Sequence, residues 1–381
     1  MREIYFDNAA TTKVDEKVVK AMLQYFTEKY GNASSQHEKG REAYMALEKS
    51  REIIAKSINA DNKEIYFTSG GTESDNWALK GIFFENKKTG KNHIITTKIE
   101  HDSTLKTCEW LQTQGAEITY LDVDREGFID LEQLKNSITE KTILVSIIHG
   151  NNEIGTIQDL KKIGQICKEK NVLFHTDACQ SFTKEPLNMR KQYLDLITIN
   201  AHKIYGPKGV GALIVRKGVK ITPLLHGGGH ESGMRSGTEN VPGIIGFAKA
   251  AELMRQKNVL YMKRLRDKLI KKVLRIKGTR LNGHPKKRLC NNVNIIFHGV
   301  EGEALLLRLD SHGIMCSTGS ACSSNSLKPS HVLTAMGLKP EQAHSSIRFS
   351  VGKQNTLNEI NYVVKVLEKE VKSLRKISMV K

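Results

Sequence analysis

The sequence predicts an α/β protein with a mostly parallel central sheet and a smaller α/β second domain. Short β-branched runs alternate with helix-patterned stretches through the middle of the chain. These runs are apolar along their whole length, as strands buried on both faces of a sheet are. The chain has 381 residues, enough for about two domains with sizeable cores.

The strand-like runs of the first domain are bounded by turn residues or by helical patterns. In chain order they are 64–69, 93–97, 142–148, 172–176, 196–200 and 211–216. Helix-patterned stretches lie between them, such as the run that begins near Thr72 and the run 157–171. This alternation is typical of βαβ units, in which ligands bind beyond the carboxyl ends of the strands.

A second α/β piece follows. Its predicted elements are a basic helix within 255–280, a strand at 291–297, a helix at 302–313, a strand at 346–351 and a last helix at 356–375. We therefore expect a large domain over residues 16–256. A small domain would combine residues 1–15 with 257–381.

The composition excludes several classes of protein. Hydrophobic residues make up 39% and charged residues 26%, and no apolar run approaches the roughly 18 residues that span a bilayer. The N-terminal segment "MREIYFDNAATT" has neither an apolar signal region nor transit-peptide character. We expect a cytoplasmic protein without a membrane partner. Six scattered cysteines without a CxxC pair argue against a disulfide framework.

The net charge of +18 comes from 59 Lys and Arg against 41 Asp and Glu. The stretch 255–280 holds eleven of the basic residues and one acid, Asp267. Its apolar residues at helical spacing are Leu265, Leu269, Val273 and Ile276. The basic face is either simply solvated or attracts an acidic protein or an RNA. Without aromatic interleaving or a nucleic-acid motif, we expect no direct nucleic-acid readout.

Polar residues follow the predicted strands. After 64–69, Gly70, Gly71 and Thr72 open a helix, which suits either an anion site or a plain helix cap. His101 follows 93–97, and it could be structural or catalytic. Two adjacent amides, Asn151 and Asn152, follow 142–148.

The next two strands end in charged residues. Asp177 and Gln180 follow 172–176, and a carboxylate directly after a buried strand usually has a cationic partner. His202 and Lys203 follow 196–200, where a lysine is costly to bury without a bond or a pair. Together these residues match the needs of pyridoxal phosphate: a lysine for the Schiff base, an acid for the pyridine nitrogen and a helix N-terminus for the phosphate. A nucleotide site is disfavoured, because neither GxxxxGK[ST] nor a GxGxxG after a strand is present.

The segment "STGSACSS" (317–324) places Cys322 among small residues. It is either an ordinary Gly/Ser loop or a mobile loop that presents a reachable thiol. His312 and Cys316 lie nearby in the sequence, which raises the alternative of a zinc site. No paired CxxC ligands accompany them, so we expect no metal.

The ordered motifs resemble those of cysteine desulfurases over essentially the whole chain. They are "YFDNAATT", "TSGGTESDN", "EH" at 100–101, "NNEIGTIQ", "TDACQ", "AHKIYGPKGVGAL", "HGGGHESGMRSGTEN", "STGSACSS" and "AHSSIRFS". This family is the class V aminotransferase branch of the fold-type I pyridoxal-phosphate enzymes. The resemblance is strongest to the group that supplies sulfur for iron–sulfur clusters.

The resemblance implies a role for each matching residue around the ring. Lys203 would form the Schiff base and Asp177 would pair with the pyridine nitrogen. His101 would stack on the ring and assist proton transfer, and Gln180 would bind the phenolic oxygen. Cys179 stands inside the Asp–Gln motif, where the family has Thr, Val or Ala.

The phosphate would be bound by Gly71, Thr72 and His202. Asn200 stands where relatives commonly have Ser, and its amide can still donate a hydrogen bond. Thr238 matches the position that reaches the phosphate of the other subunit, which implies a homodimer.

The substrate residues complete the implied site. Asn152 and Arg348 match positions that hold the substrate carboxylate, and a guanidinium fork suits that task. Cys322 matches the cysteine that receives sulfur as a persulfide while L-cysteine becomes L-alanine. The partners implied are L-cysteine, a second copy of the chain and a sulfur-acceptor protein such as an iron–sulfur scaffold. The alternatives are a selenocysteine lyase, a plain aminotransferase and a cofactor-free scaffold that docks sulfur acceptors.

Overall fold

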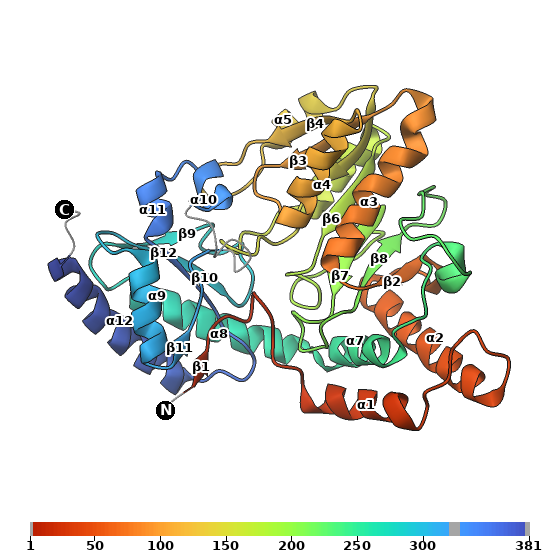
Figure 1. The fold of residues 1–381 in the computed structure, drawn as a ribbon. Coiled ribbons are helices and arrows are strands. Elements are labelled where there is room, and N and C mark those ends of the chain that lie inside the picture. Colours follow the sequence, from red (N-terminus) through yellow and green to blue (C-terminus); the bar gives the residue numbers. More distant parts are fainter. Residues whose placement is uncertain (1–2, 320–327, 378–381) are drawn as a thin grey trace.

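The computed structural model describes residues 3–319 and 328–377, so Cys322 lies outside the described residues. Figure 1 shows a part built on a long sheet and a smaller part that contains β10 and β12. Both parts combine helices with strands, which confirms the predicted α/β class. The domain boundaries at residues 15 and 256 stay a prediction.

The larger sheet has seven strands in the order β2-β8-β7-β6-β5-β3-β4. The strands are β2 (Ile65–Thr68), β3 (His93–Thr97), β4 (Glu117–Leu121), β5 (Thr142–Ser146), β6 (Leu173–Asp177), β7 (Leu196–Asn200) and β8 (Gly211–Val215). Only β8 runs antiparallel to its neighbours. The carboxyl ends of the other six strands therefore meet at one edge, as the sequence predicts.

Side chains alternate between the two faces of this sheet, and each face builds its own core. Ile94, Leu144, Leu196 and Leu213 belong to the core under α3 (Gly71–Asn86) and α4 (Asp102–Thr113). The next residue of each strand belongs to the core on the other face. These residues are Ile95, Val145, Ile197 and Ile214. Strands buried on both faces explain why the runs are apolar throughout.

The opposite face of the sheet is covered by helices of the large part other than α3 and α4. The remaining helices of this part are α1 (Glu16–Thr27), α2 (Glu38–Ile58), α5 (Leu131–Ser137), α6 (Leu160–Glu169) and α7 (Val241–Leu253), with short 3₁₀ helices at Asn62–Glu64, Lys87–Thr89 and His230–Gly233. The sequence did not predict β4. It is an edge strand whose first four residues are exposed or half-buried, so it lacks a continuous apolar run.

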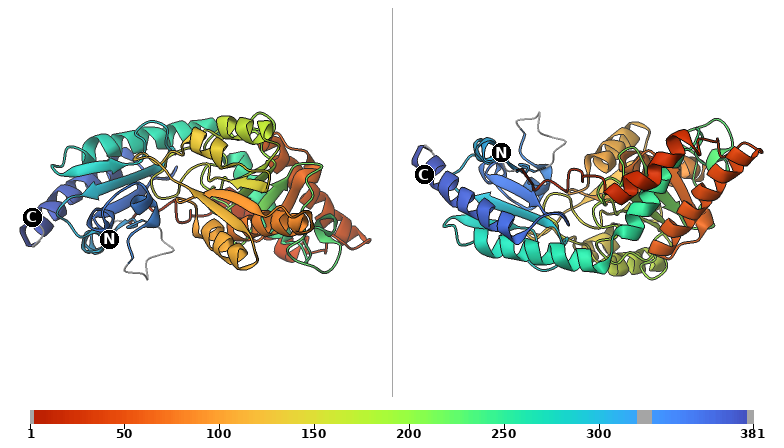
Figure 2. Two further views of the ribbon diagram at one scale, coloured as in Figure 1. Left: turned by 90° about the horizontal axis from the view of Figure 1, so that it is seen from above. Right: turned by 90° about the horizontal axis from the view of Figure 1, so that it is seen from below.

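The smaller part holds a three-stranded antiparallel sheet in the order β12-β10-β9. Its strands are β9 (Thr279–Asn282), β10 (Asn292–Phe297) and β12 (Ser346–Ser350), and its helices are α8 (Gln256–Val273), α9 (Gly302–Ser311), α10 (His331–Ala335), α11 (Pro340–His344) and α12 (Leu357–Ile377). The N-terminal β1 (Ile4–Tyr5) pairs with β11 (Ile314–Met315). The start of the chain thus joins the C-terminal part, as Figures 1 and 2 show.

Helix α8 is amphipathic, but it is shorter than the basic stretch suggested. Leu265, Leu269 and Val273 are buried, whereas Ile276 lies beyond the helix end and is half-buried. Gly278, at φ +70°, turns the chain into β9. Arg266 is also buried, and it donates to the carbonyl oxygens of Arg288 and Leu289. Within the described residues, no helix is long and apolar enough to cross a membrane.

Candidate active site

The N-terminus of α3 meets the ends of two strands at one point. Gly70 at φ +154° starts the helix without a side-chain cap, so the first backbone N–H groups of α3 remain available. A Cβ on Gly71 would lie 2.6 Å from Cys179 Sγ and 3.6 Å from Asn200 Nδ2. Asn200 and Cys179 therefore flank the helix start, and Cys179 packs there as a small residue.

This contact predicts that Gly71→Ala should weaken cofactor binding. The new methyl group would press on the buried Cys179 sulfur, and such overpacking costs about 1–3 kcal/mol. Cys179→Ala removes the obstacle, so the double variant should bind the cofactor better than Gly71→Ala alone. Absorbance titrations with the cofactor on both single variants and the double variant check this. If Gly71→Ala and the double variant lost the same amount of cofactor affinity, the steric explanation would be wrong.

Asp177 is the last residue of β6 and Gln180 lies three residues beyond it, and both are buried. Asp177 Oδ1 accepts the backbone N–H of Cys179 at 2.8 Å, which fixes the direction of the carboxylate. Gln180 Nε2 donates to the carbonyl oxygen of Ala9 at 2.8 Å. These bonds orient both side chains before any ligand is present.

Lys203 follows β7 and is half-buried. Its Nζ has no hydrogen-bond or ion-pair partner among the residues that the structure describes. The neighbouring His202 contacts Thr11 Oγ1 through Nδ1 at 3.2 Å. Burial, and then the charge of Lys203, lower the pKa of His202 to about 4, so this imidazole is neutral at physiological pH. A free amine and a neutral imidazole thus lie at the sheet edge.

His101 is the N-cap of α4, and its Nδ1 accepts the backbone N–H of Ser103 at 3.1 Å. Burial, followed by the charge of Lys203, lowers the pKa of His101, while Asp177 acts in the opposite direction. A cavity of about 330 Å³ lies between the starts of α3 and α4, and Thr72 and His101 are among its lining residues. The structure therefore places His101 near Lys203, Asp177 and the α3 N-terminus.

Asn152 and Arg348 come together from the two parts of the chain. Arg348, on β12, donates through Nη1 to the carbonyl oxygen of Asn152 at 3.1 Å. Its Nη2 donates to Asp7 Oδ1 at 2.9 Å. The guanidinium is thus held in place by the N-terminal segment and by the loop after β5.

Thr238 lies apart from these groups, exposed on the loop before α7. It lines a small cavity together with Ser69 and Gly209. Arg235 of the same loop forms an ion pair with Glu73 near the start of α3, at 2.8 Å. The loop is therefore anchored beside the α3 N-terminus of its own chain, and a role for Thr238 in a second subunit stays a prediction.

Unpartnered polar atoms give an independent indication that the predicted site residues bind pyridoxal phosphate. Four of the predicted residues carry buried polar atoms without a hydrogen-bond partner among the described residues. These atoms are Gln180 Oε1, Asn152 Oδ1, Asn200 Oδ1 and Arg348 Nε. Buried polar atoms normally find partners, so four orphans at one site point to polar groups of a bound cofactor and substrate.

The sequence did not point to two polar residues beside His101. Ser103 contacts His101 directly, and Asp75 contacts Ser103. Ser103 Oγ lies 2.7 Å from His101 Nδ1 and 2.6 Å from Asp75 Oδ2. Asp75 is buried on the face of α3 that covers the sheet. An acid on the apolar face of a predicted helix was the signal that could have found it.

The zinc alternative receives no support from the residues that can be placed. His312 Nε2 contacts Glu370 Oε1 at 3.1 Å, and Cys316 lies one residue beyond β11. Within residues 3–319 and 328–377, no three His, Cys, Asp or Glu side chains form a group that could hold a metal ion.

The fold and the site define a class of enzyme, and comparison with known families agrees. The aminotransferase class-V family model matches residues 4–363. The chain therefore belongs to this family, whose cofactor is pyridoxal 5′-phosphate.

Within that family the chain groups with the cysteine desulfurases. It is 52% identical to "Cysteine desulfurase IscS" of Methanosarcina thermophila, over 99% of this chain and 94% of the relative. A solved "NIFS-LIKE PROTEIN" superposes with a TM-score of 0.92 at 40% identity, over 98% of this chain and 100% of that one. "SspA in complex with cysteine" has a TM-score of 0.82 at 35% identity, over 93% and 100%. The predicted family, fold, enzyme class and cofactor are confirmed.

Proposed function

We propose that this enzyme converts L-cysteine to L-alanine and keeps the sulfur as a persulfide on Cys322 for delivery to an acceptor. The observation that carries the proposal is the meeting of Lys203, Asp177 and the α3 N-terminus at one sheet edge. Asn152 and Arg348 add a carboxylate-binding pair. Similarity to a solved protein in complex with cysteine supports the choice of substrate.

The chain's own residues divide the work of holding the cofactor. Gly71, Thr72, Asn200 and His202 would bind its phosphate at the α3 N-terminus, where free N–H groups favour an anion. Asp177 would keep the ring nitrogen protonated. When bound, pyridoxal phosphate supplies an electron sink that weakens bonds at the Cα and Cβ of the substrate.

Lys203 and Arg348 act on the substrate. The Lys203 amine has no partner among the described residues, so it would hold the cofactor covalently and, when released, would move the proton on the substrate Cα. Arg348 Nε is an unpartnered donor that can bind the substrate carboxylate. Asn152 would add its Nδ2 amide group as a second donor. Asp7 holds Arg348 in its buried position.

The described cysteines support Cys322 by elimination. Burial raises the pKa of all five, which are Cys108, Cys167, Cys179, Cys290 and Cys316. The pKa rises to about 11 for Cys290 and to about 12 for Cys108. A thiol that holds its proton is a poor nucleophile, so none of the five suits sulfur capture. Cys322, in its run of small residues, is the remaining candidate.

We also infer that the enzyme is a cytoplasmic homodimer that serves iron–sulfur cluster assembly. Thr238 supports the dimer, because it is exposed on a loop anchored near the phosphate end of the site. Nearly all of the basic residues of the stretch 255–280 are exposed, with Arg266 as the buried exception. This basic surface would attract an acidic acceptor protein.

The products test the proposal. With L-cysteine and a small thiol reductant, the purified enzyme should release alanine and sulfide in equal amounts. Release of a keto acid would identify an aminotransferase, and turnover of selenocysteine alone would identify a selenocysteine lyase. With an acidic acceptor in place of the reductant, added salt should slow sulfur delivery, because exposed charges are screened over about 10 Å at 0.1 M. Alanine formation with the small thiol reductant should change little.

A further inference from the structure

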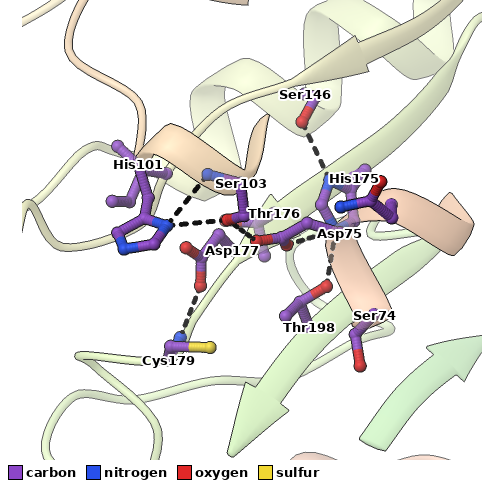
Figure 3. A network of polar contacts seen from close by, with 12 residues as sticks. Ser74, Asp75, His101, Ser103, Ser146, His175, Thr176, Asp177, Cys179 and Thr198 are labelled. Atoms are coloured by element: carbon purple, nitrogen blue, oxygen red, sulfur yellow. Dashed lines mark hydrogen bonds and ion pairs between the residues drawn. The ribbon is translucent and has the colours of Figure 1, made fainter. Parts of the chain in front are cut away.

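Three polar groups run in a line from the interior of α3 to the cofactor site. Asp75, Ser103 and His101 contact one another in that order, as Figure 3 shows. Asp75 Oδ2 lies 2.6 Å from Ser103 Oγ, and Ser103 Oγ lies 2.7 Å from His101 Nδ1. Both Asp75 and Ser103 are buried, so water does not compete for these contacts.

The number of hydrogens available to Asp75, Ser103 and His101 determines which group donates in each of the two contacts. The Ser103 hydroxyl has one hydrogen but makes two short contacts. His101 Nδ1 cannot supply the second hydrogen, because it already accepts the backbone N–H of Ser103 at 3.1 Å. The second hydrogen must then come from Asp75.

We propose that Asp75 is a neutral carboxylic acid that donates to Ser103, and that Ser103 donates to His101 Nδ1, so that the imidazole is neutral with its proton on Nε2. Asp75 and Ser103 are thus positioning residues, and His101 would be the group that touches the cofactor. This inference rests on the proposed function only for the role of His101 in the reaction. The proton positions along Asp75, Ser103 and His101 do not depend on that function.

The surroundings of Asp75 favour the neutral acid. Its Oδ1 makes no well-formed hydrogen bond among the described residues, which would leave a buried carboxylate poorly solvated. Contacts with Ser103 and Thr198 lower the pKa of Asp75, but by less than its surroundings raise it. Burial, and then the charge of Asp177, raise the pKa of Asp75 well above its usual value. Two adjacent buried carboxylates do not both ionise readily.

The neighbouring His175 does not supply a positive charge that would stabilise an ionised Asp75. His175 Nε2 lies 3.8 Å from Asp75 Oδ1, but it also contacts Thr198 Oγ1 at 3.0 Å. Burial lowers the pKa of His175 to about 4, so it carries no positive charge. Glu100 is buried too, and burial raises its pKa to about 8.

The charged groups around His101 act on its ring from several elements. They are Lys203 after β7, Asp177 on β6, Asp102 on α4 and His331 on α10. Two hydrogen bonds donated to Nδ1 stabilise the neutral imidazole further. His101 Nε2 has no partner among the described residues, so its N–H is free to donate to a group in the cofactor site.

Histidine-ring NMR of the cofactor-loaded protein tests the proposal directly, with the spectrum of His101→Gln assigning the signal. The wild type should show the neutral Nε2–H form and a pKa below the ordinary value of about 6.5. Ser103→Ala removes one bond to the neutral ring, so the pKa should rise by roughly 0.5–1 unit. Ser103→Thr keeps the hydroxyl and should restore the wild-type value.

Asp75→Asn separates the two charge states of Asp75. Asparagine has the shape of a neutral acid and can donate to Ser103, so the His101 signal should stay close to wild type. If Asp75 were an ionised carboxylate, the same variant would remove a negative charge and lower the His101 pKa. That lowering would overturn the proposal, as would an Nδ1–H ring in the wild type or an unchanged pKa in Ser103→Ala.

The wild-type spectrum decides the ring form even if a variant fails to fold. None of these readouts uses turnover of cysteine. A protein with the expected ring form but without alanine production would leave this inference intact and remove the proposed function.

Discussion

Replacing Lys203 with alanine should abolish both alanine production and covalent retention of the cofactor. Lys203 is the one predicted site residue with a free amine at the carboxyl edge of the sheet. The variant loses the covalent attachment and the proton transfer together, and proton transfer alone contributes about 10²–10⁴-fold to a rate. Turnover should therefore fall by more than about a thousandfold. Alanine release and borohydride fixation of the cofactor, followed by mass spectrometry, measure the two effects.

Lys184 provides the matched control. It is buried like a functional lysine, its Nζ has no hydrogen-bond partner among the described residues, and burial lowers its pKa to about 8. Lys184→Ala should still give the borohydride adduct on Lys203. An adduct found on Lys184, or an active Lys203→Ala enzyme, would show that the wrong lysine has been assigned.

Changing Cys322 to serine should stop sulfur transfer while leaving substrate binding in place. The hydroxyl cannot take sulfur from the substrate, so alanine production should fall by roughly a hundredfold or more. Rapid mixing with L-cysteine should still change the cofactor's absorbance, because Lys203, Asn152 and Arg348 are intact. Rate and spectrum together separate the chemical step from binding.

Cys316→Ser is the control for that variant. Cys316 is half-buried just after β11, and burial raises its pKa. Its loss should leave alanine production near the wild-type rate. If Cys316→Ser were inactive and Cys322→Ser active, the sulfur would have to pass through the strand region instead of the 317–324 segment.

The sequence predicted the site well where polar residues directly follow buried strands. Asp177 is the last residue of β6, and Lys203 lies three residues after β7. A parallel sheet brings such positions to one edge, so spacing along the chain becomes proximity in space. Asn152 and Arg348 lie far apart in the sequence, and only the resemblance to a family connected them.

The missed features do not directly follow a buried strand, so this signal could not find them. The edge strand β4 alternates too weakly to be distinguished from a loop. Asp75 and Ser103 are in helices, and their meeting depends on how α3 packs against α4. The apolar spacing of the basic stretch predicts a helix that includes Ile276, yet α8 ends at Val273, and the chain turns at Gly278 and continues as β9. Pairing of β9 with β10 is a tertiary contact that helical spacing cannot reveal.

The central claim is that sulfur leaves cysteine at the cofactor site and is held on Cys322. Mass spectrometry of proteolytic peptides after brief exposure of the wild type to L-cysteine tests it most directly. The account predicts one added sulfur on the peptide that contains Cys322. Added sulfur on the peptides of Cys316 or Cys179 instead, with Cys322 unmodified, would contradict it.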